Sequence, residues 1–154
     1  KIMDFERKYK LLTTDLVEKE INIKELFDWK NKVLLYFYPK DNTPGCTLEN
    51  KDFSCLKNDF LEIWIKIFWV SKDAIDLHKK FIEKQFLKND LISDVTLELH
   101  KELGAYWEKN NYWKKVMWVI RSTFLFDKEW TLIKEWKNVK ATWHAQRILN
   151  ELQN

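Results

Sequence analysis

The strongest hydrophobic pattern in the chain is an unbroken apolar and aromatic run over residues 33–38, closed by Pro39. A run without polar alternation is typical of a strand buried on both faces of a sheet. A second run covers residues 65–70, and a shorter one lies around residues 91–93. Helical spacing over residues 74–85 predicts a helix there. Further helices are expected over residues 46–60, 97–103 and 143–152.

Residues 122–126 and 131–136 read as two strands joined by a hairpin turn at 127–130. The order strand, helix, strand, helix, strand, helix, hairpin, helix predicts an α/β fold with a mixed sheet and helices on both faces. In such sheets the reactive group usually lies just past the carboxyl end of a central strand. That position is the loop 39–46.

Length, charge and hydropathy narrow the class of protein. We expect the 154 residues to form one domain over 1–154, since 45% hydrophobic content suffices for a core. A formal charge of +3 argues against a strongly basic nucleic-acid binder. Because no apolar run approaches the length of a membrane span, we expect no membrane partner and a cytoplasmic location.

The loop after the first strand carries the candidate chemistry. Cys46 is expected in the first turn of a helix, where unpaired N–H groups and the helix dipole favour a thiolate and lower the cysteine pKa below about 8.5. The Thr43 hydroxyl is close enough to reach whatever the sulfur attacks, and Pro39 and Pro44 stiffen the loop. The alternative is that Cys46 is a small buried hydrophobic residue.

The string of residues 36–47, YFYPKDNTPGCT, resembles the active-site signature of peroxiredoxins: Pro, three residues, Thr, two residues, Cys. In particular it resembles the peroxiredoxin Q or bacterioferritin-comigratory-protein group. Residues 121–127, RSTFLFD, are similar to the strand in which the family keeps its active-site arginine, and residues 137–145 to its C-terminal segment. The resemblance runs from about residue 27 to the end and is weaker over residues 1–26.

The resemblance implies a thioredoxin-like fold and a thiol-dependent peroxidase for hydrogen peroxide and organic hydroperoxides. It places the nucleophile, which becomes a sulfenic acid, at Cys46. It places the peroxide-orienting hydroxyl at Thr43, the loop-shaping residue at Pro39 and the cationic stabiliser at Arg121. A thioredoxin-like protein would supply electrons, with no cofactor or metal, in a monomer or weak dimer. The alternative function is a non-catalytic thioredoxin-fold binding or chaperone-like module.

The second cysteine departs from the subgroup. The resolving cysteine often follows five residues after the nucleophile, which here is Lys51, whereas Cys55 follows after nine. On an intact helix that spacing is about 13.5 Å, and a disulfide needs Cα atoms roughly 5.5–6 Å apart. Either the helix unwinds for a bridge between Cys46 and Cys55, or Cys55 packs in the core and an external thiol resolves the sulfenic acid.

The remaining chemical candidates are weaker. His78, His100 and His144 lack ligand-like spacing, so we expect surface or cap histidines rather than a metal site. Residues 112–115, YWKK, could stack on bases, but a solvated loop is the favoured interpretation because acidic residues are interleaved and the charge is nearly balanced.

The composition contains one anomaly, which is 2 glycines beside 9 tryptophans, where about eleven glycines are usual for this length. Trp130 closes a hairpin turn and Trp64 follows a predicted helix, two places that favour glycine. Trp136 alone lies where the family expects tryptophan. The other eight align with customary family glycines: Trp29, Trp64, Trp69, Trp107, Trp113, Trp118, Trp130 and Trp143. We hypothesise that the source organism reads UGA as glycine and that UGA was translated as tryptophan.

Overall fold

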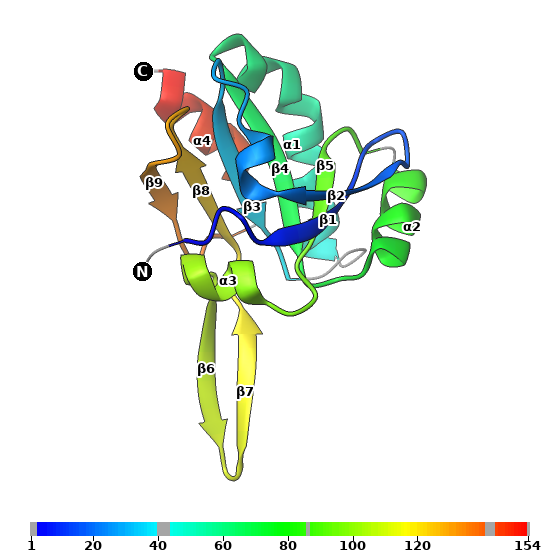
Figure 1. The fold of residues 1–154 in the computed structure, drawn as a ribbon, viewed down its shortest axis with the longest axis vertical. Coiled ribbons are helices and arrows are strands. Elements are labelled where there is room, and N and C mark those ends of the chain that lie inside the picture. Colours follow the sequence, from blue (N-terminus) through cyan, green and yellow to red (C-terminus); the bar gives the residue numbers. More distant parts are fainter. Residues whose placement is uncertain (1–2, 40–43, 86, 141–143, 154) are drawn as a thin grey trace.

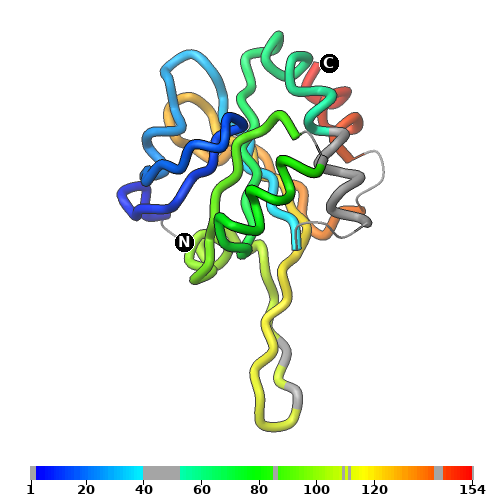
Figure 2. Tube along the Cα trace, turned by 90° about the vertical axis from the view of Figure 1, so that its right-hand side faces the viewer, coloured from blue at the N-terminus to red at the C-terminus, as the bar shows by residue number. Residues whose placement is uncertain are grey.

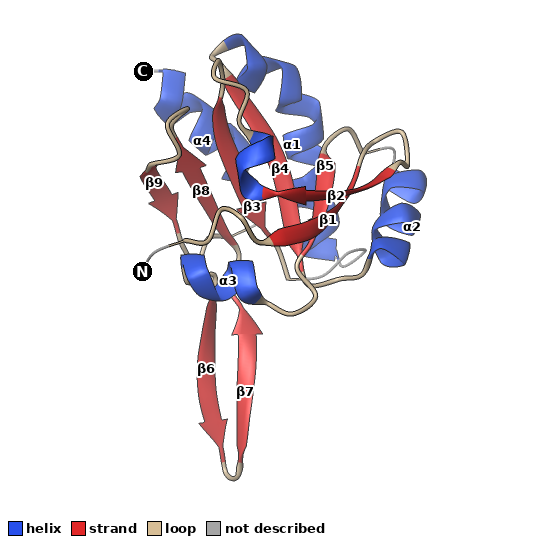
Figure 3. Cartoon of the chain, viewed as in Figure 1, coloured by secondary structure: helices blue, strands red, loops and turns tan. Residues whose placement is uncertain are grey.

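The computed structural model describes residues 3–39, 44–85, 87–140 and 144–153, and for residues 44–52, 85, 109 and 111 the backbone alone. Figures 1 and 3 show the helices and strands. In chain order they are β1 (Lys8–Leu12), β2 (Glu18–Asn22), the 3-10 helix η1 (Ile23–Leu26), β3 (Lys32–Phe37), α1 (Pro44–Glu62), β4 (Ile65–Ser71), α2 (Ile75–Gln85), β5 (Asp90–Ser93), α3 (Glu98–Leu103), β6 (Tyr106–Asn111), β7 (Lys114–Val119), β8 (Ser122–Phe126), β9 (Leu132–Trp136) and α4 (His144–Gln153).

The central sheet has seven strands among the described residues, in the order β2-β1-β5-β4-β3-β8-β9. The strands β3, β4 and β5 are parallel, and β8 returns antiparallel to β3. The predicted mixed α/β architecture is confirmed, as are all the predicted helices and strands, with their ends shifted by at most two residues. The carboxyl ends of β3 and β4 therefore lie at one edge of the sheet.

The core divides between the two faces of the sheet, and β3 contributes to both. Leu34 and Tyr36 belong to one hydrophobic cluster with residues of α1, α2 and α4. Leu35 and Phe37 belong to the other, with residues of η1 and with Leu99 of α3. Figure 1 shows α1 and α4 behind the sheet and α3 in front of it. The continuous apolar run of β3 is explained by burial on both sides.

Two hairpins were absent from the sequence prediction. In the first, β2 is an edge strand with mostly exposed charged residues, so its sequence carries little strand signal. In the second, β6 and β7 pair outside the central sheet and project from the body (Figures 1 and 2). The prediction of a solvated loop over 112–115 was wrong for Lys114 and Lys115, which begin β7. Trp113 at the tip is 99% exposed.

Among the described residues, no helix combines the length and the apolar character needed to cross a membrane.

Candidate active site

The predicted site elements meet at the carboxyl end of β3. Phe37, its last residue, pairs with Ser122, the first residue of β8. Arg121 precedes Ser122, and Pro39 follows two residues after Phe37, so the register brings both to the same edge of the sheet. Pro39 is half-buried, and the neighbouring Tyr38 N–H donates to the carbonyl of Val70 at 3.2 Å. Arg121 and Pro39 are more than eighty positions apart in the sequence, and the fold brings them to the same edge of the sheet.

The helix α1 begins at Pro44, so Cys46 is its third residue and lies in the first turn, as predicted. Only six residues separate the end of β3 from the start of α1. Thr43 lies outside the described residues, and so does the side chain of Cys46. The short connection ties the start of α1 to the edge that carries Arg121.

The Arg121 side chain is anchored from below by Tyr36. Its Nη1 donates to the Tyr36 hydroxyl oxygen at 2.6 Å. The Tyr36 ring is fully buried, with ring centroids 5.5 Å from Tyr38 and 4.8 Å from Phe53 of α1. No sequence signal points to this role, because a tyrosine inside an apolar strand is interpreted as a core residue. The guanidinium is therefore held by a fixed, buried acceptor.

His144 lies beneath the same edge at the start of α4 and is buried, so the expectation of a surface position was wrong. Its Nε2 is hydrogen-bonded to Thr123 Oγ1 at 2.8 Å. Burial, and next the positive charges of Arg147 and Arg121, lower the pKa of His144 to about 4. The ring is therefore neutral near pH 7. Helix α4 buries His144 because the side chain at its first position faces the sheet rather than solvent.

Cys55 is exposed on α1 and carries a free thiol, so the alternative in which it packs in the core is wrong. The buried face of this part of α1 is formed by Phe53 and Phe60, with Leu56 packed against the core cluster. Cys55 lies on the side of the helix opposite to that buried face. It follows Cys46 by nine positions on one unbroken helix, a rise of about 13.5 Å.

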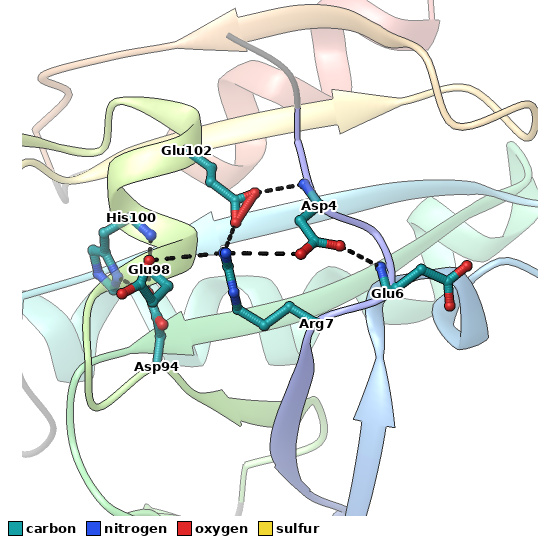
Figure 4. Close-up of polar contacts among 7 residues, drawn as sticks. All are labelled: Asp4, Glu6, Arg7, Asp94, Glu98, His100 and Glu102. Atoms are coloured by element: carbon teal, nitrogen blue, oxygen red, sulfur yellow. Dashed lines mark hydrogen bonds and ion pairs between the residues drawn. The ribbon is translucent and has the colours of Figure 1, made fainter.

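A second buried polar pair lies at the start of α3 (Figure 4). Asp94 Oδ2 accepts hydrogen bonds from the His100 backbone N–H at 2.9 Å and pairs with His100 Nδ1 at 2.6 Å. Both side chains are fully buried, so the surface prediction for His100 was also wrong. The His100 ring meets Phe37 edge-on, with centroids 4.8 Å apart. The pair fixes α3 beneath the end of β3.

Charged residues extend this cluster to the N-terminal segment. Arg7 forms ion pairs with Glu102 and, at 3.7–3.8 Å, with Asp4 and Glu98 (Figure 4). The backbone N–H of Asp4 donates to Glu102 at 2.7 Å. These contacts connect the segment before β1 to α3. They hold in place a part of the chain for which the sequence predicts no helix or strand.

His78 on α2 is likewise fully buried, against its surface prediction. Within the part of the chain that the structure describes, no group of three or more His, Cys, Asp or Glu side chains could hold a metal ion.

The comparisons with known proteins agree on one family. Residues 1–134 match the AhpC/TSA family. The chain is 43% identical to peroxiredoxin Bcp of Bacillus subtilis over 131 residues, which cover 84% of this chain and 83% of that protein. It is 40% identical to peroxiredoxin Bcp of Xanthomonas campestris over 121 residues, covering 79% and 76%.

A solved structure shares the fold at similar coverage. The bacterioferritin comigratory protein of Xanthomonas campestris superposes with a TM-score of 0.85 at 33% identity, covering 97% of this chain and 91% of that one. The predicted thioredoxin-like fold is thereby confirmed. The chain therefore belongs to the AhpC/TSA family and, within it, to the peroxiredoxins of the Bcp or peroxiredoxin Q type.

Proposed function

We propose that this peroxiredoxin reduces hydrogen peroxide and organic hydroperoxides with Cys46 as its nucleophile and Arg121 as its cationic stabiliser. The observation that carries this assignment is the convergence of two features at one edge. The Arg121 guanidinium is anchored at the carboxyl end of β3, and the helix that follows β3 after a six-residue connection has Cys46 in its first turn. The similar Xanthomonas campestris protein is described by its alkyl peroxide reduction activity.

The proposed reaction transfers one oxygen atom to sulfur. The Cys46 thiolate attacks the nearer peroxide oxygen, an S–O bond forms, and the O–O bond breaks. The leaving oxygen takes the electron pair and a proton and departs as water or an alcohol, and Cys46 becomes a sulfenic acid. Negative charge develops on the leaving oxygen, and a fixed guanidinium stabilises that charge best because it is always protonated and needs no reorganisation.

Thr43 and Pro39 complete the proposed site by their match to the family signature. The Thr43 hydroxyl would orient the peroxide oxygens, and Pro39 would limit water access to the loop. Pro39 lies half-buried at the edge of the sheet that carries Arg121, a position that suits this role.

The catalytic cycle is completed when external thiols reduce the sulfenic acid of Cys46 back to the thiol. One external thiol condenses with the sulfenic acid, releasing water and forming a mixed disulfide, and a second thiol reduces that disulfide. We infer an external thiol of the thioredoxin type, since Cys55 is separated from Cys46 by an unbroken helix. We also propose that the enzyme acts in the cytoplasm as a monomer or weak dimer.

A Cys46→Ser variant tests the assignment in a coupled assay that follows peroxide consumption with dithiothreitol or thioredoxin as the reductant. We expect turnover to be lost completely, while Arg121→Gln lowers kcat/KM by roughly 10²-fold, as the removal of one charge-stabilising donor does. Cys55→Ser is the matched cysteine control. Undiminished turnover in Cys46→Ser would overturn the assignment of Cys46, and a wild-type protein without turnover would favour the alternative, a non-catalytic thioredoxin-fold binding or chaperone-like module.

A further inference from the structure

Tyr36 contacts the candidate site through its hydroxyl group and not through its backbone. It lies opposite Thr123 in the β3–β8 register, two residues along β8 from Arg121. Its hydroxyl oxygen accepts a hydrogen bond from Arg121 Nη1 at 2.6 Å. A bond from a charged donor is stronger and more directional than a bond between neutral groups.

The Tyr36 ring cannot move without disturbing the core. It is fully buried, stacks on Tyr38 with an interplanar angle of 23°, and contacts Phe53 of α1. From this geometry we propose that Tyr36 is a positioning residue: it holds the Arg121 guanidinium in the orientation that stabilises the leaving oxygen. This inference rests on the proposed function of Arg121.

The test is a Tyr36→Phe variant, which removes one oxygen atom and keeps the ring. We expect kcat/KM for hydrogen peroxide to fall about tenfold, the equivalent of one lost charge-assisted bond in the transition state. The matched control is Tyr9→Phe, since Tyr9 is a buried tyrosine of β1 that belongs to the opposite core cluster. That control should keep kcat/KM within about twofold of wild type.

A double variant separates positioning from general packing. In an Arg121→Gln background, Tyr36→Phe should produce no further loss, because the hydroxyl acts through the guanidinium. An equal loss in both backgrounds, or an unchanged kcat/KM in the single variant, would overturn the role of Tyr36. If the wild-type protein itself shows no peroxidase turnover, it is the proposed function that fails.

A different observation concerns the tryptophans. Three of them, Trp29, Trp64 and Trp130, have left-handed backbones with φ of 67°, 62° and 70°. In that region the Cβ of an L-residue crowds its own backbone, and glycine, which has no Cβ, is the residue usually found. We propose that glycine occupies these three positions in the protein as its own cell makes it.

The local hydrogen bonds show why each position needs the left-handed backbone. Trp64 is the second residue past the end of α1, and its N–H donates back to Leu61 at 3.0 Å, which is the usual place of a glycine that ends a helix. Trp130 closes the β8–β9 turn, where its N–H donates to Asp127 at 3.1 Å. The backbone therefore adopts glycine-type turns regardless of the indoles.

Among the other suspect positions, the exposed indoles contribute little to the core, whereas Trp69 belongs to it. Trp113 is almost fully exposed, and Trp107 and Trp118 stack on each other about half-exposed on the projecting hairpin (Figure 2). Trp69 is fully buried, but its Nε1 has no hydrogen-bond partner among the described residues. Trp143 lies outside those residues. Trp29 and Trp64 also line an open surface pocket of about 630 Å³.

Trp136 provides the contrast within the same chain. It lies in strand β9 and packs against the core cluster, and its Nε1 donates to Glu151 at 3.0 Å. The Lys134 ammonium lies 5.1 Å from its ring centroid. Trp136 thus combines core packing with a hydrogen-bonded indole N–H and an ordinary strand backbone, a combination that none of the three left-handed tryptophans has.

Peptide mass spectrometry of the protein purified from its own cells tests the proposal. The reference is the same protein expressed from the printed sequence in a host that inserts tryptophan. We expect the native peptides that contain residues 29, 64 and 130 to be lighter by the difference between an indole side chain and a hydrogen atom, and the peptide that contains Trp136 to be identical. Native masses that match tryptophan at the three positions would overturn the proposal.

Discussion

At residue 29, the energetic cost of the left-handed backbone can be measured as a difference in the free energy of unfolding between two variants. Trp29 has φ of 67° and is 75% exposed. The turn is held by Asp28, whose Oδ1 accepts from the N–H groups of Lys30 at 3.0 Å and Asn31 at 2.8 Å. Those bonds do not involve the side chain at position 29. The perturbation is therefore a pair of variants, Trp29→Ala and Trp29→Gly, that both remove the indole and differ by one methyl group.

The expected magnitude follows from two opposing terms. A residue with a Cβ pays roughly 1–2 kcal/mol to adopt the left-handed conformation, and glycine does not. Glycine instead loses about 0.5–1 kcal/mol more than alanine in conformational entropy when the chain folds. We therefore expect Trp29→Gly to exceed Trp29→Ala in free energy of unfolding by about 0.5–1 kcal/mol.

The same pair of substitutions at Trp136 should give the opposite sign. Residue 136 lies in strand β9, where alanine adopts the backbone without strain and only the entropic cost of glycine remains. We expect Trp136→Gly to be less stable than Trp136→Ala by about 0.5–1 kcal/mol. Both variants at this position should also lose about 1–3 kcal/mol relative to the parent, because they remove a partly buried, hydrogen-bonded indole.

Equilibrium unfolding in urea, followed by far-UV circular dichroism, measures these differences without depending on tryptophan fluorescence. A difference of about 0.8 kcal/mol moves the midpoint by roughly 0.4 M when the slope is near 2 kcal/mol/M. The slopes of the paired variants must agree for the comparison to hold. If Trp29→Ala equals or exceeds Trp29→Gly in stability, the conformational argument for glycine at this position is wrong.

Three further outcomes are expected. Because burial lowers the pKa of His144 to about 4 from an ordinary value near 6.5, the unfolded chain binds the proton first. The free energy of unfolding should therefore be complete above pH 6.5 and fall by at most about 3 kcal/mol towards pH 4. A His144→Gln variant should flatten this urea-measured pH profile, and an unchanged profile would exclude His144 as its cause. Cys55→Ser should keep peroxide turnover with an external dithiol. In the parent protein, mass analysis after one equivalent of peroxide should find no disulfide between Cys46 and Cys55; a stoichiometric disulfide would instead show that α1 unwinds. Asp94→Ala should lower the free energy of unfolding by about 3 kcal/mol, because it leaves two buried donors of His100 without an acceptor. Thermal or urea unfolding measures this difference, and a decrease under about 0.5 kcal/mol would contradict a structural role for the Asp94–His100 pair.

Local sequence was sufficient wherever an element is defined by its own residues. The run over 33–38 predicts β3 because a strand covered on both faces must be apolar throughout. The loop from Pro39 to Cys46 could be assigned because proline, threonine and a cysteine at a helix start form a contiguous pattern. The β2 strand was missed because its charged residues form a strand only through pairing with β1.

The three histidines show the opposite case. No sequence pattern separates a buried histidine from an exposed one when its partners are distant, as Thr123 is from His144. The same reason hides Tyr36, since its hydroxyl is defined by a guanidinium 85 residues further along the chain.

The sequence by itself determined the α/β class, the candidate chemistry of Cys46, Thr43 and Arg121, and the excess of tryptophan over glycine. Only the tertiary structure decided that Arg121 is anchored on Tyr36, that Cys55 is exposed, and that three tryptophans have left-handed backbones. The division has one physical reason. Hydrophobic periodicity and contiguous motifs are local properties of the chain, whereas burial, hydrogen-bond partners and the backbone angle at a turn depend on which distant segments the sheet brings together.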